Sequence, residues 1–133
     1  MLKGKTATLM FVGWMGLVTL LSLFSFSDME LPGDGVPNLD KIVHFVFYSG
    51  MAFLCILALR ERSHRAFPIR RALLLGFCFA VIYGIIIEVF QKWFTVDRQG
   101  DILDVAANTF GAMVGTLGIK ILYSGKRQLK WKN

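Results

Sequence analysis

Four long apolar segments, separated by short charged segments, set the pattern of the chain. Charged residues are absent from 6–27, 42–59, 72–87 and 105–119. A helix needs about 20 mostly apolar residues to cross the hydrocarbon core of a membrane. The first two segments are long enough alone, and the other two reach this length if their helices extend into the flanking charged residues. We therefore predict four transmembrane helices, at about residues 7–26, 41–59, 72–93 and 101–123.

The composition excludes the other common classes of chain. The 133 residues are 55% hydrophobic and only 18% charged, whereas soluble domains average about 25% charged residues. The 12 Phe residues are too many for a disordered chain. We expect an all-α membrane protein in which a bundle of four transmembrane helices forms a single domain over residues 1–133, with a basic cytoplasmic tail at 124–133.

The distribution of basic residues predicts the orientation in the membrane. The net charge is +6, and twelve of the fifteen Lys and Arg residues lie in the two terminal tails and between the second and third apolar segments. Such segments face the cytoplasm, so both termini are expected there and the two acidic loops outside. We expect a multi-pass protein of the inner (cytoplasmic) membrane. Because the basic charge reports topology, membrane lipid is an expected partner and nucleic acid is not.

The first apolar segment has an alternative interpretation as a cleaved signal peptide. It is longer than the apolar region of such a peptide and is not closed by an A-x-A cleavage site, which favours a retained helix. Cys55 and Cys78 lie inside predicted helices, where a cysteine usually packs as a small apolar residue. The chain has no CxxC, GxSxG, HExxH or Walker A motif, and we expect no cofactor and no metal.

Three groups of polar residues lie at the predicted outward ends of helices two to four. On the second helix, Asp40, His44 and Tyr48 are spaced by four, so they share one face at increasing depth. Asn38 and Asp40 are alternative N-caps of this helix. On the third helix, Glu88 and Gln91 also share a face. With the residues of the third group, these form what we term the polar cluster: Asp40, Lys41, His44, Tyr48, Glu88, Gln91, Arg98, Asp101, Asp104 and Asn108.

The third group continues into a row of glycines. Its positions advance by three or four residues, which makes one stripe on the fourth helix, acidic at the outer end and glycine-lined deeper: Asp101, Asp104, Asn108, Gly111, Gly115 and Gly118. Glycines let another helix approach closely, so we expect the last three to pack helices. The Gly111/Gly115 face is also a candidate contact for a homo-oligomer.

These residues resemble the VanZ-like family of small bacterial membrane proteins. The resemblance rests on D-K-x-x-H-F-x-x-Y from Asp40, E-x-x-Q from Glu88, Arg98, and D-x-x-x-N-x-x-G-x-x-x-G from Asp104, in the order and spacing of the family. It covers about residues 38–118. It implies a role in the bacterial cell envelope, and the member that gives the family its name implies resistance to lipid-bearing glycopeptides such as teicoplanin.

Two functional hypotheses give the chain no catalytic activity. In the first, the polar cluster engages a lipid-linked or amphiphilic ligand at the outer leaflet, with Lys41 and Arg98 pairing with its phosphate or carboxylate. In the second, the polar residues only hold the helices together, and the chain acts as a scaffold.

A third hypothesis is a membrane enzyme acting on a lipid-linked substrate. His44 would be the general base and Glu88 or Asp104 the orienting or acidic group, while Tyr48 and Asn108 would stabilise developing charge. A metal-dependent version of this enzyme would use these ligands: Asp40, His44, Glu88 and Asp104.

Overall fold

The computed structural model describes residues 5–24, 36–63, 68–94 and 101–124. These residues form four α-helices and no strand: α1 (Thr6–Leu23), α2 (Leu39–Arg62), α3 (Ile69–Phe94) and α4 (Ile102–Ser124). Each helix is long and apolar enough to cross a membrane. The predicted all-α fold with four membrane-spanning helices is therefore confirmed.

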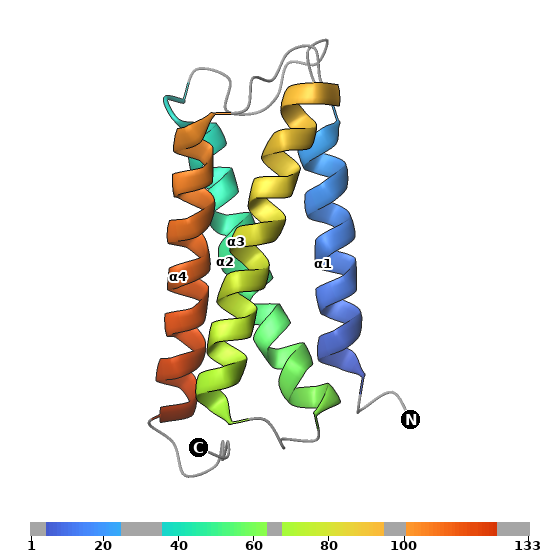
Figure 1. Cartoon of the computed structure of the whole chain (residues 1–133), viewed down its shortest axis with the longest axis vertical. Coiled ribbons are helices and arrows are strands. Elements are labelled where there is room, and N and C mark those ends of the chain that lie inside the picture. The colour runs from blue at the N-terminus through green and yellow to red at the C-terminus, as the bar shows by residue number, and fades with distance from the viewer. Residues whose placement is uncertain (1–4, 25–35, 64–67, 95–100, 125–133) are drawn as a thin grey trace.

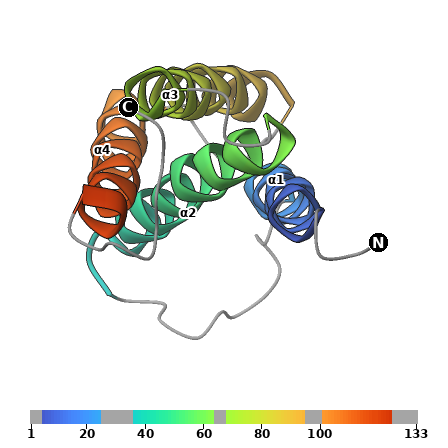
Figure 2. The same ribbon diagram turned by 90° about the horizontal axis from the view of Figure 1, so that it is seen from below.

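Successive helices run in opposite directions along the long axis of the bundle (Figure 1). The start of α1 and the end of α4 consequently lie at the same end. α2 packs against each of the other three helices, and the view along the bundle shows it between α1 and α4 (Figure 2). This order brings the start of α2, the end of α3 and the start of α4 together at the opposite end.

The helices do not end where the charge-free segments end. α2 begins at Leu39 and runs to Arg62, and α3 begins at Ile69, so both exceed the predicted 41–59 and 72–93. Long basic side chains at a helix end extend to the membrane surface while their stems stay on apolar surface, so a charged residue does not end the helix. α1 is shorter than predicted because the backbone of Phe24 is extended, with φ −76° and ψ 130°.

Glycines allow α4 to pack directly on the backbone of α2. A Cβ atom at Gly111 would overlap the carbonyl group of Phe45, and a Cβ atom at Gly115 would overlap that of Ser49. A Cβ atom at Gly118 would make only ordinary van der Waals contact with the ring of Phe53 in α2. The Gly111/Gly115 face is thus occupied by α2 of the same chain, so a homo-oligomer through this face would first have to displace α2.

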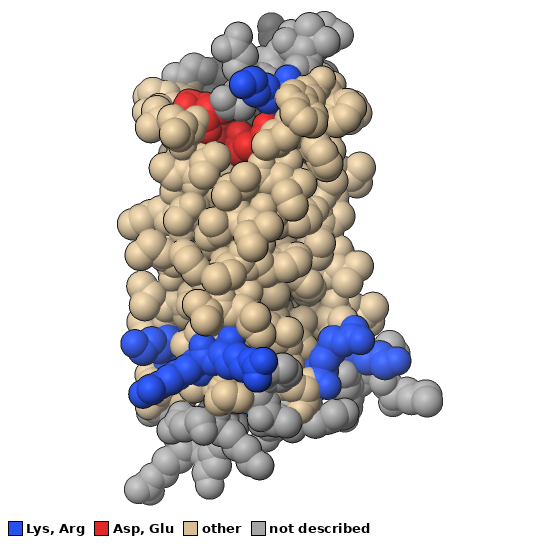
Figure 3. Space-filling view, viewed as in Figure 1, with Lys and Arg blue, Asp and Glu red and all other residues tan. Residues whose placement is uncertain are grey.

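The surface of the bundle suits a lipid environment. Large apolar side chains are exposed on every helix, for example Leu9, Val46, Leu74 and Ile121. Figure 3 shows Lys and Arg side chains in a band across the end where α1 begins and α4 ends, and carboxylates gathered at the other end with basic side chains beside them. An apolar belt between two charged ends is typical of a chain that crosses a bilayer. The assignment of the basic end to the cytoplasm stays a prediction of the positive-inside rule.

Candidate functional site

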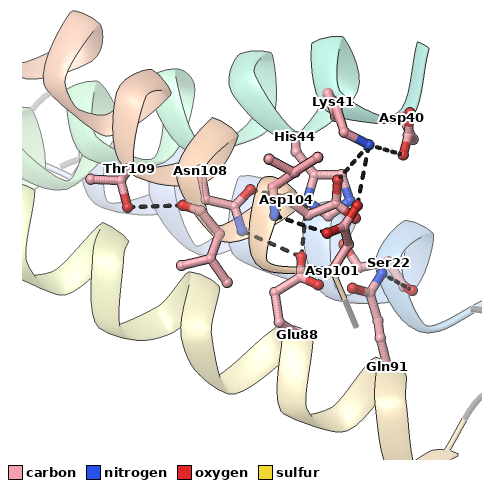
Figure 4. A network of polar contacts seen from close by, with 12 residues as sticks. Ser22, Asp40, Lys41, His44, Glu88, Gln91, Asp101, Asp104, Asn108 and Thr109 are labelled. Atoms are coloured by element: carbon pink, nitrogen blue, oxygen red, sulfur yellow. Dashed lines mark hydrogen bonds and ion pairs between the residues drawn. The ribbon is translucent and has the colours of Figure 1, made fainter. Parts of the chain in front are cut away.

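Polar side chains from α2, α3 and α4 meet at the acidic end of the bundle (Figure 4). They come from the first turns of α2 and α4 and the last two turns of α3, which the antiparallel order places side by side. Hydrogen bonds or ion pairs join seven of the predicted residues: Asp40, Lys41, His44, Glu88, Asp101, Asp104 and Asn108. Residues separated by more than 60 positions in the sequence thus form a network of two adjoining bonded groups, one around Lys41 and one around His44.

The innermost part of this network is an imidazole held between an amide and a carboxylate. Nδ1 of His44 lies 2.9 Å from Oδ1 of Asn108 and 3.1 Å from Oε1 of Glu88. The side-chain amide of Asn108 also donates to Oε1 of Glu88, at 3.4 Å. All three residues are buried. Two acceptors converge on Nδ1, so this nitrogen carries a hydrogen, and in the neutral ring the lone pair lies on Nε2.

The outer part of the network is a lysine among three carboxylates. Nζ of Lys41 lies 3.1 Å from Asp40 and 3.5 Å from both Asp101 and Asp104. The side chains of Asp40 and Asp101 are 55% and 40% exposed, whereas that of Asp104 is only 12% exposed. Asp104 therefore lies between the exposed outer carboxylates and the buried His44 and Glu88, with a ligand atom within 4.8 Å of theirs. Because three carboxylates already surround Lys41, its charge is largely neutralised inside the chain.

His44, Glu88 and Asp104 form a compact group of possible ligands that we term the buried triad. One ligand atom of each lies within 4.8 Å of the ligand atoms of the other two. Their backbones belong to three different helices, so the group exists only in the folded bundle. The exposed Asp40 pairs with Lys41 and does not belong to this group.

Several buried polar atoms of the site have unused hydrogen-bonding capacity. Among the described residues, Oε2 of Glu88, Oδ1 of Asp104 and the hydroxyl of Tyr48 have no hydrogen-bond partner. The ion pair of this Asp104 oxygen with Lys41 is long, at 3.5 Å. A buried polar group without a hydrogen bond costs about 1–3 kcal/mol. Such atoms could still bind a further partner at this site.

The remaining predicted residues lie beside the network or outside the described part. Tyr48 is fully buried one turn below His44, and its ring and the amide of Asn108 both lie against Gly84 of α3. Gln91 is buried at the same end, where its amide donates to the carbonyl of Ser22 at 2.8 Å. Arg98 lies outside the described residues.

Two local roles differ from what the residue types indicate. Asn38 occupies the N-cap position of α2 in a left-handed conformation, with φ 59°, but its side chain makes no capping bond. At the start of a different helix, α4, Asp101 does act as a cap, because its carboxylate accepts the N–H of Leu103 at 3.0 Å. Asp101 therefore fixes the start of α4 while it also faces Lys41.

Sequence reasoning did not identify the contribution of α1 to this end of the bundle. The buried Ser22 receives the hydrogen bond of Gln91, and deeper in the bundle the hydroxyls of Thr19 and Tyr83 form another contact between α1 and α3. Thr19 and Ser22 are polar residues within the first apolar segment, spaced by three. That spacing was the available signal, because it places both on the face that meets α3.

Comparison with known proteins gives one match. A profile of the VanZ/LLP1 family matches residues 4–123. No curated protein and no solved structure matches the chain. The matched range contains all four helices and every member of the polar cluster. Together with the four membrane-spanning helices, this match shows that the chain is a multi-pass membrane protein that belongs to the VanZ/LLP1 family.

Proposed function

We propose that this protein acts in the bacterial cell envelope, where its polar cluster engages the polar end of a lipid-like envelope component. By this interaction it would lower the sensitivity of the cell to lipid-bearing glycopeptides of the teicoplanin type. The observation that carries the proposal is the buried network of His44, Glu88, Asp104 and Asn108 at one end of an otherwise apolar bundle. Ionisable groups at membrane depth are expensive to bury, which favours a function for them.

The position of the network supports contact with a headgroup at the membrane surface. Its outer members, Asp40 and Asp101, are half exposed, and Asp104 continues the network inward. By the positive-inside rule this end faces outward, which is the leaflet at which a glycopeptide acts. The apolar surfaces of the helices just below it suit the acyl or prenyl chain of an amphiphile.

The proposal is tested by susceptibility of a sensitive host that expresses the full chain. We expect the wild type to raise the minimal inhibitory concentration of teicoplanin more than that of vancomycin, because only teicoplanin carries an acyl chain. Glu88→Gln, which removes one buried charge with little change of volume, should abolish this difference. Thr116→Val is the matched control, because the hydroxyl of Thr116 bonds only within α4, to Ala112 at 2.8 Å.

Membrane levels of all variants are compared by immunoblotting, so that loss of protein is not read as loss of function. Equal susceptibility of cells with wild type, Glu88→Gln and empty vector, at normal wild-type levels, would refute the role in resistance.

A membrane enzyme is the second candidate, and the contact between His44 and Glu88 favours it. A carboxylate 3.1 Å from Nδ1 orients the imidazole and stabilises its charged form, as a general base requires. The wild type and His44→Gln would be incubated in nanodiscs of bacterial lipid extract, and the lipids analysed by mass spectrometry. A product formed only by the wild type supports catalysis, and identical lipid profiles would exclude it for these lipids.

A further inference from the structure

We infer that His44, Glu88 and Asp104 bind a divalent transition-metal ion, of the class of Zn²⁺ or Mn²⁺. The inference deepens the proposed function and, for the role of the ion, rests on it. The acidic cluster repels an anionic headgroup, and a bound divalent ion would supply the positive charge that a phosphate or carboxylate of an amphiphile needs. The binding of the ion itself is argued from the buried triad alone.

The ligand atoms of the buried triad lie close together. One imidazole nitrogen and one oxygen from each of two carboxylates lie within 4.8 Å of one another. Around a tetrahedral ion with bonds of about 2.1 Å, neighbouring ligand atoms are about 3.4 Å apart. The ligand atoms would have to approach by up to about 1.4 Å, and the Glu88 and Asp104 side chains have rotatable bonds that permit such an adjustment.

A second feature of the site is electrostatic. Asp104 and Glu88 are buried carboxylates in a membrane-embedded site, and the cation that the described residues place against them, Lys41, also faces Asp40 and Asp101. Among the residues that the structure describes at this site, four carboxylates share one lysine and one imidazole. Buried charge of one sign is destabilising unless it is compensated. A divalent cation at the buried triad would compensate two of these charges at once.

In the part of the chain that the structure describes, two carboxylate oxygens on different helices have lone pairs that no hydrogen bond uses. Oε2 of Glu88 and Oδ1 of Asp104 have no hydrogen-bond partner among the described residues, and the Glu88 side chain is only 6% exposed. One turn below His44, the fully buried hydroxyl of Tyr48 has no partner either. The Asp104 oxygen has a long ion pair with Lys41, at 3.5 Å, in addition. Lone pairs without a hydrogen bond are what a metal ion and its bound water would use.

A further feature of the site is how His44 is held. Its Nδ1–H faces Oδ1 of Asn108 and Oε1 of Glu88, at 2.9 and 3.1 Å. Because Glu88 lies on the Nδ1 side of the ring, Nδ1 is the nitrogen that can share an ion with Glu88, and in the ion-bound ring the hydrogen would lie on Nε2 instead. Asn108, whose amide also donates to Oε1 of Glu88, acts as a positioning residue. One imidazole with two carboxylates suits Zn²⁺ or Mn²⁺ better than Ca²⁺ or Mg²⁺, which prefer oxygen ligands alone.

The experiment measures metal on the full chain in detergent, purified through a tag without histidine. The protein is stripped with a chelator and dialysed against Zn²⁺ or Mn²⁺, and bound metal is measured by mass spectrometry together with the melting temperature. We expect one ion per chain and a higher melting temperature in the wild type. His44→Gln, Glu88→Gln and Asp104→Asn should each weaken binding by about tenfold or more.

Glu61→Gln is the matched control, because it changes a carboxylate at the opposite end of the bundle, where Glu61 bonds to the first turn of α1. It should bind the ion like the wild type. Equal metal content of the wild type and the three triad variants would overturn the inference. Stabilisation by Ca²⁺ or Mg²⁺ but not by Zn²⁺ or Mn²⁺ would overturn the assigned metal class.

A triad variant that fails to fold does not leave the question open, because the wild type is tested by itself. Its melting temperature should fall on chelation and recover on addition of Zn²⁺ or Mn²⁺, and a melting temperature insensitive to both treatments would refute the site. Failure of the metal site and failure of the proposed function are separable. If the protein raises teicoplanin resistance but binds no metal, only the metal site is refuted. If it binds metal but does not change resistance, only the role in resistance is refuted.

Discussion

Asn108 joins the two chemically different halves of the buried network. Its amide oxygen faces the imidazole of His44, and its amide nitrogen donates to Glu88. Asn108 is buried to 1% exposure, so no solvent can replace either bond. An amide is the side chain that offers an acceptor and a donor from the same rigid plane, which explains why this type of residue fits the position.

We expect Asn108→Leu to destabilise the protein, since it keeps the volume but removes both bonds. Leaving the buried groups of His44 and Glu88 without these partners should cost about 1–3 kcal/mol. The free energy of unfolding, measured by denaturant titration in detergent micelles, checks this value. Thr116→Val should stay within error of the wild type. Unfolding of Asn108→Leu at the wild-type midpoint would contradict the bridging role.

The helices themselves were the most predictable feature of the chain. The hydrophobic effect makes apolar segments of about 20 residues cross a membrane as helices, so their number follows from the positions of the charges. The helix ends were less predictable, because charged residues at the ends of α2 and α3 continue the helix. The close packing of α4 on α2 follows from glycines spaced along one face.

The site was predictable only in part, and the reason lies in how helices pack. Spacings of three and four residues place Asp40 and His44, or Asp104 and Asn108, on one face of their own helix. They do not determine which residues of two helices meet, since that depends on the rotation of each helix in the bundle. The three-carboxylate surroundings of Lys41 and the bond from Gln91 to Ser22 therefore could not be predicted from the sequence.

The packing of α4 on α2 gives a test at the level of the helix pair. A Cβ atom at Gly111 would overlap the carbonyl of Phe45, and backbone cannot move aside as a side chain can. We expect Gly111→Ala to lower the free energy of unfolding by about 1–3 kcal/mol through overpacking. Gly13→Ala is the control, because no atom lies within 4 Å of a Cβ at this position of α1.

Both glycine variants would be compared by thermal unfolding and by size-exclusion chromatography. Gly13→Ala should be as stable as the wild type or slightly more so, because alanine favours helix over glycine. Equal stability of Gly111→Ala and the wild type would show that the backbones of α2 and α4 do not touch. A selective loss of a dimer in Gly111→Ala would instead support the oligomer contact.

The described part of the molecule is polarised, with a basic end, an apolar belt and an end where carboxylates gather (Figure 3). The positive-inside rule predicts that the acidic end faces outward. Phe94 is exposed at the end of α3 on the acidic side, and Ser124 ends α4 on the basic side. The two positions therefore report opposite faces of the membrane.

We expect Phe94→Cys to react with a membrane-impermeant maleimide added to intact cells, after Cys55 and Cys78 have been replaced by Ala. Ser124→Cys in the same background should react only after the membrane is made permeable. The reverse pattern of labelling would place the acidic end in the cytoplasm and would contradict the outward-facing site.

A substitution at the acidic end can distinguish a functional site from interhelical contacts that merely stabilise the bundle. Asp104 is the buried carboxylate that lies between the outer and inner parts of the network. Asp104→Asn removes one of several neighbouring negative charges and keeps the shape of the side chain, so the fold should keep or gain stability. A residue needed only to hold helices together would behave in the opposite way.

The most direct test of the functional role of the polar cluster is the teicoplanin susceptibility of cells that carry Asp104→Asn at the membrane level of the wild type. We expect the inhibitory concentration to fall to that of cells without the protein, while the melting temperature of the purified variant is not lowered when it and the wild type are compared after treatment with a chelator. Unchanged resistance accompanied by a lower melting temperature would contradict this account and identify the cluster as a purely structural contact.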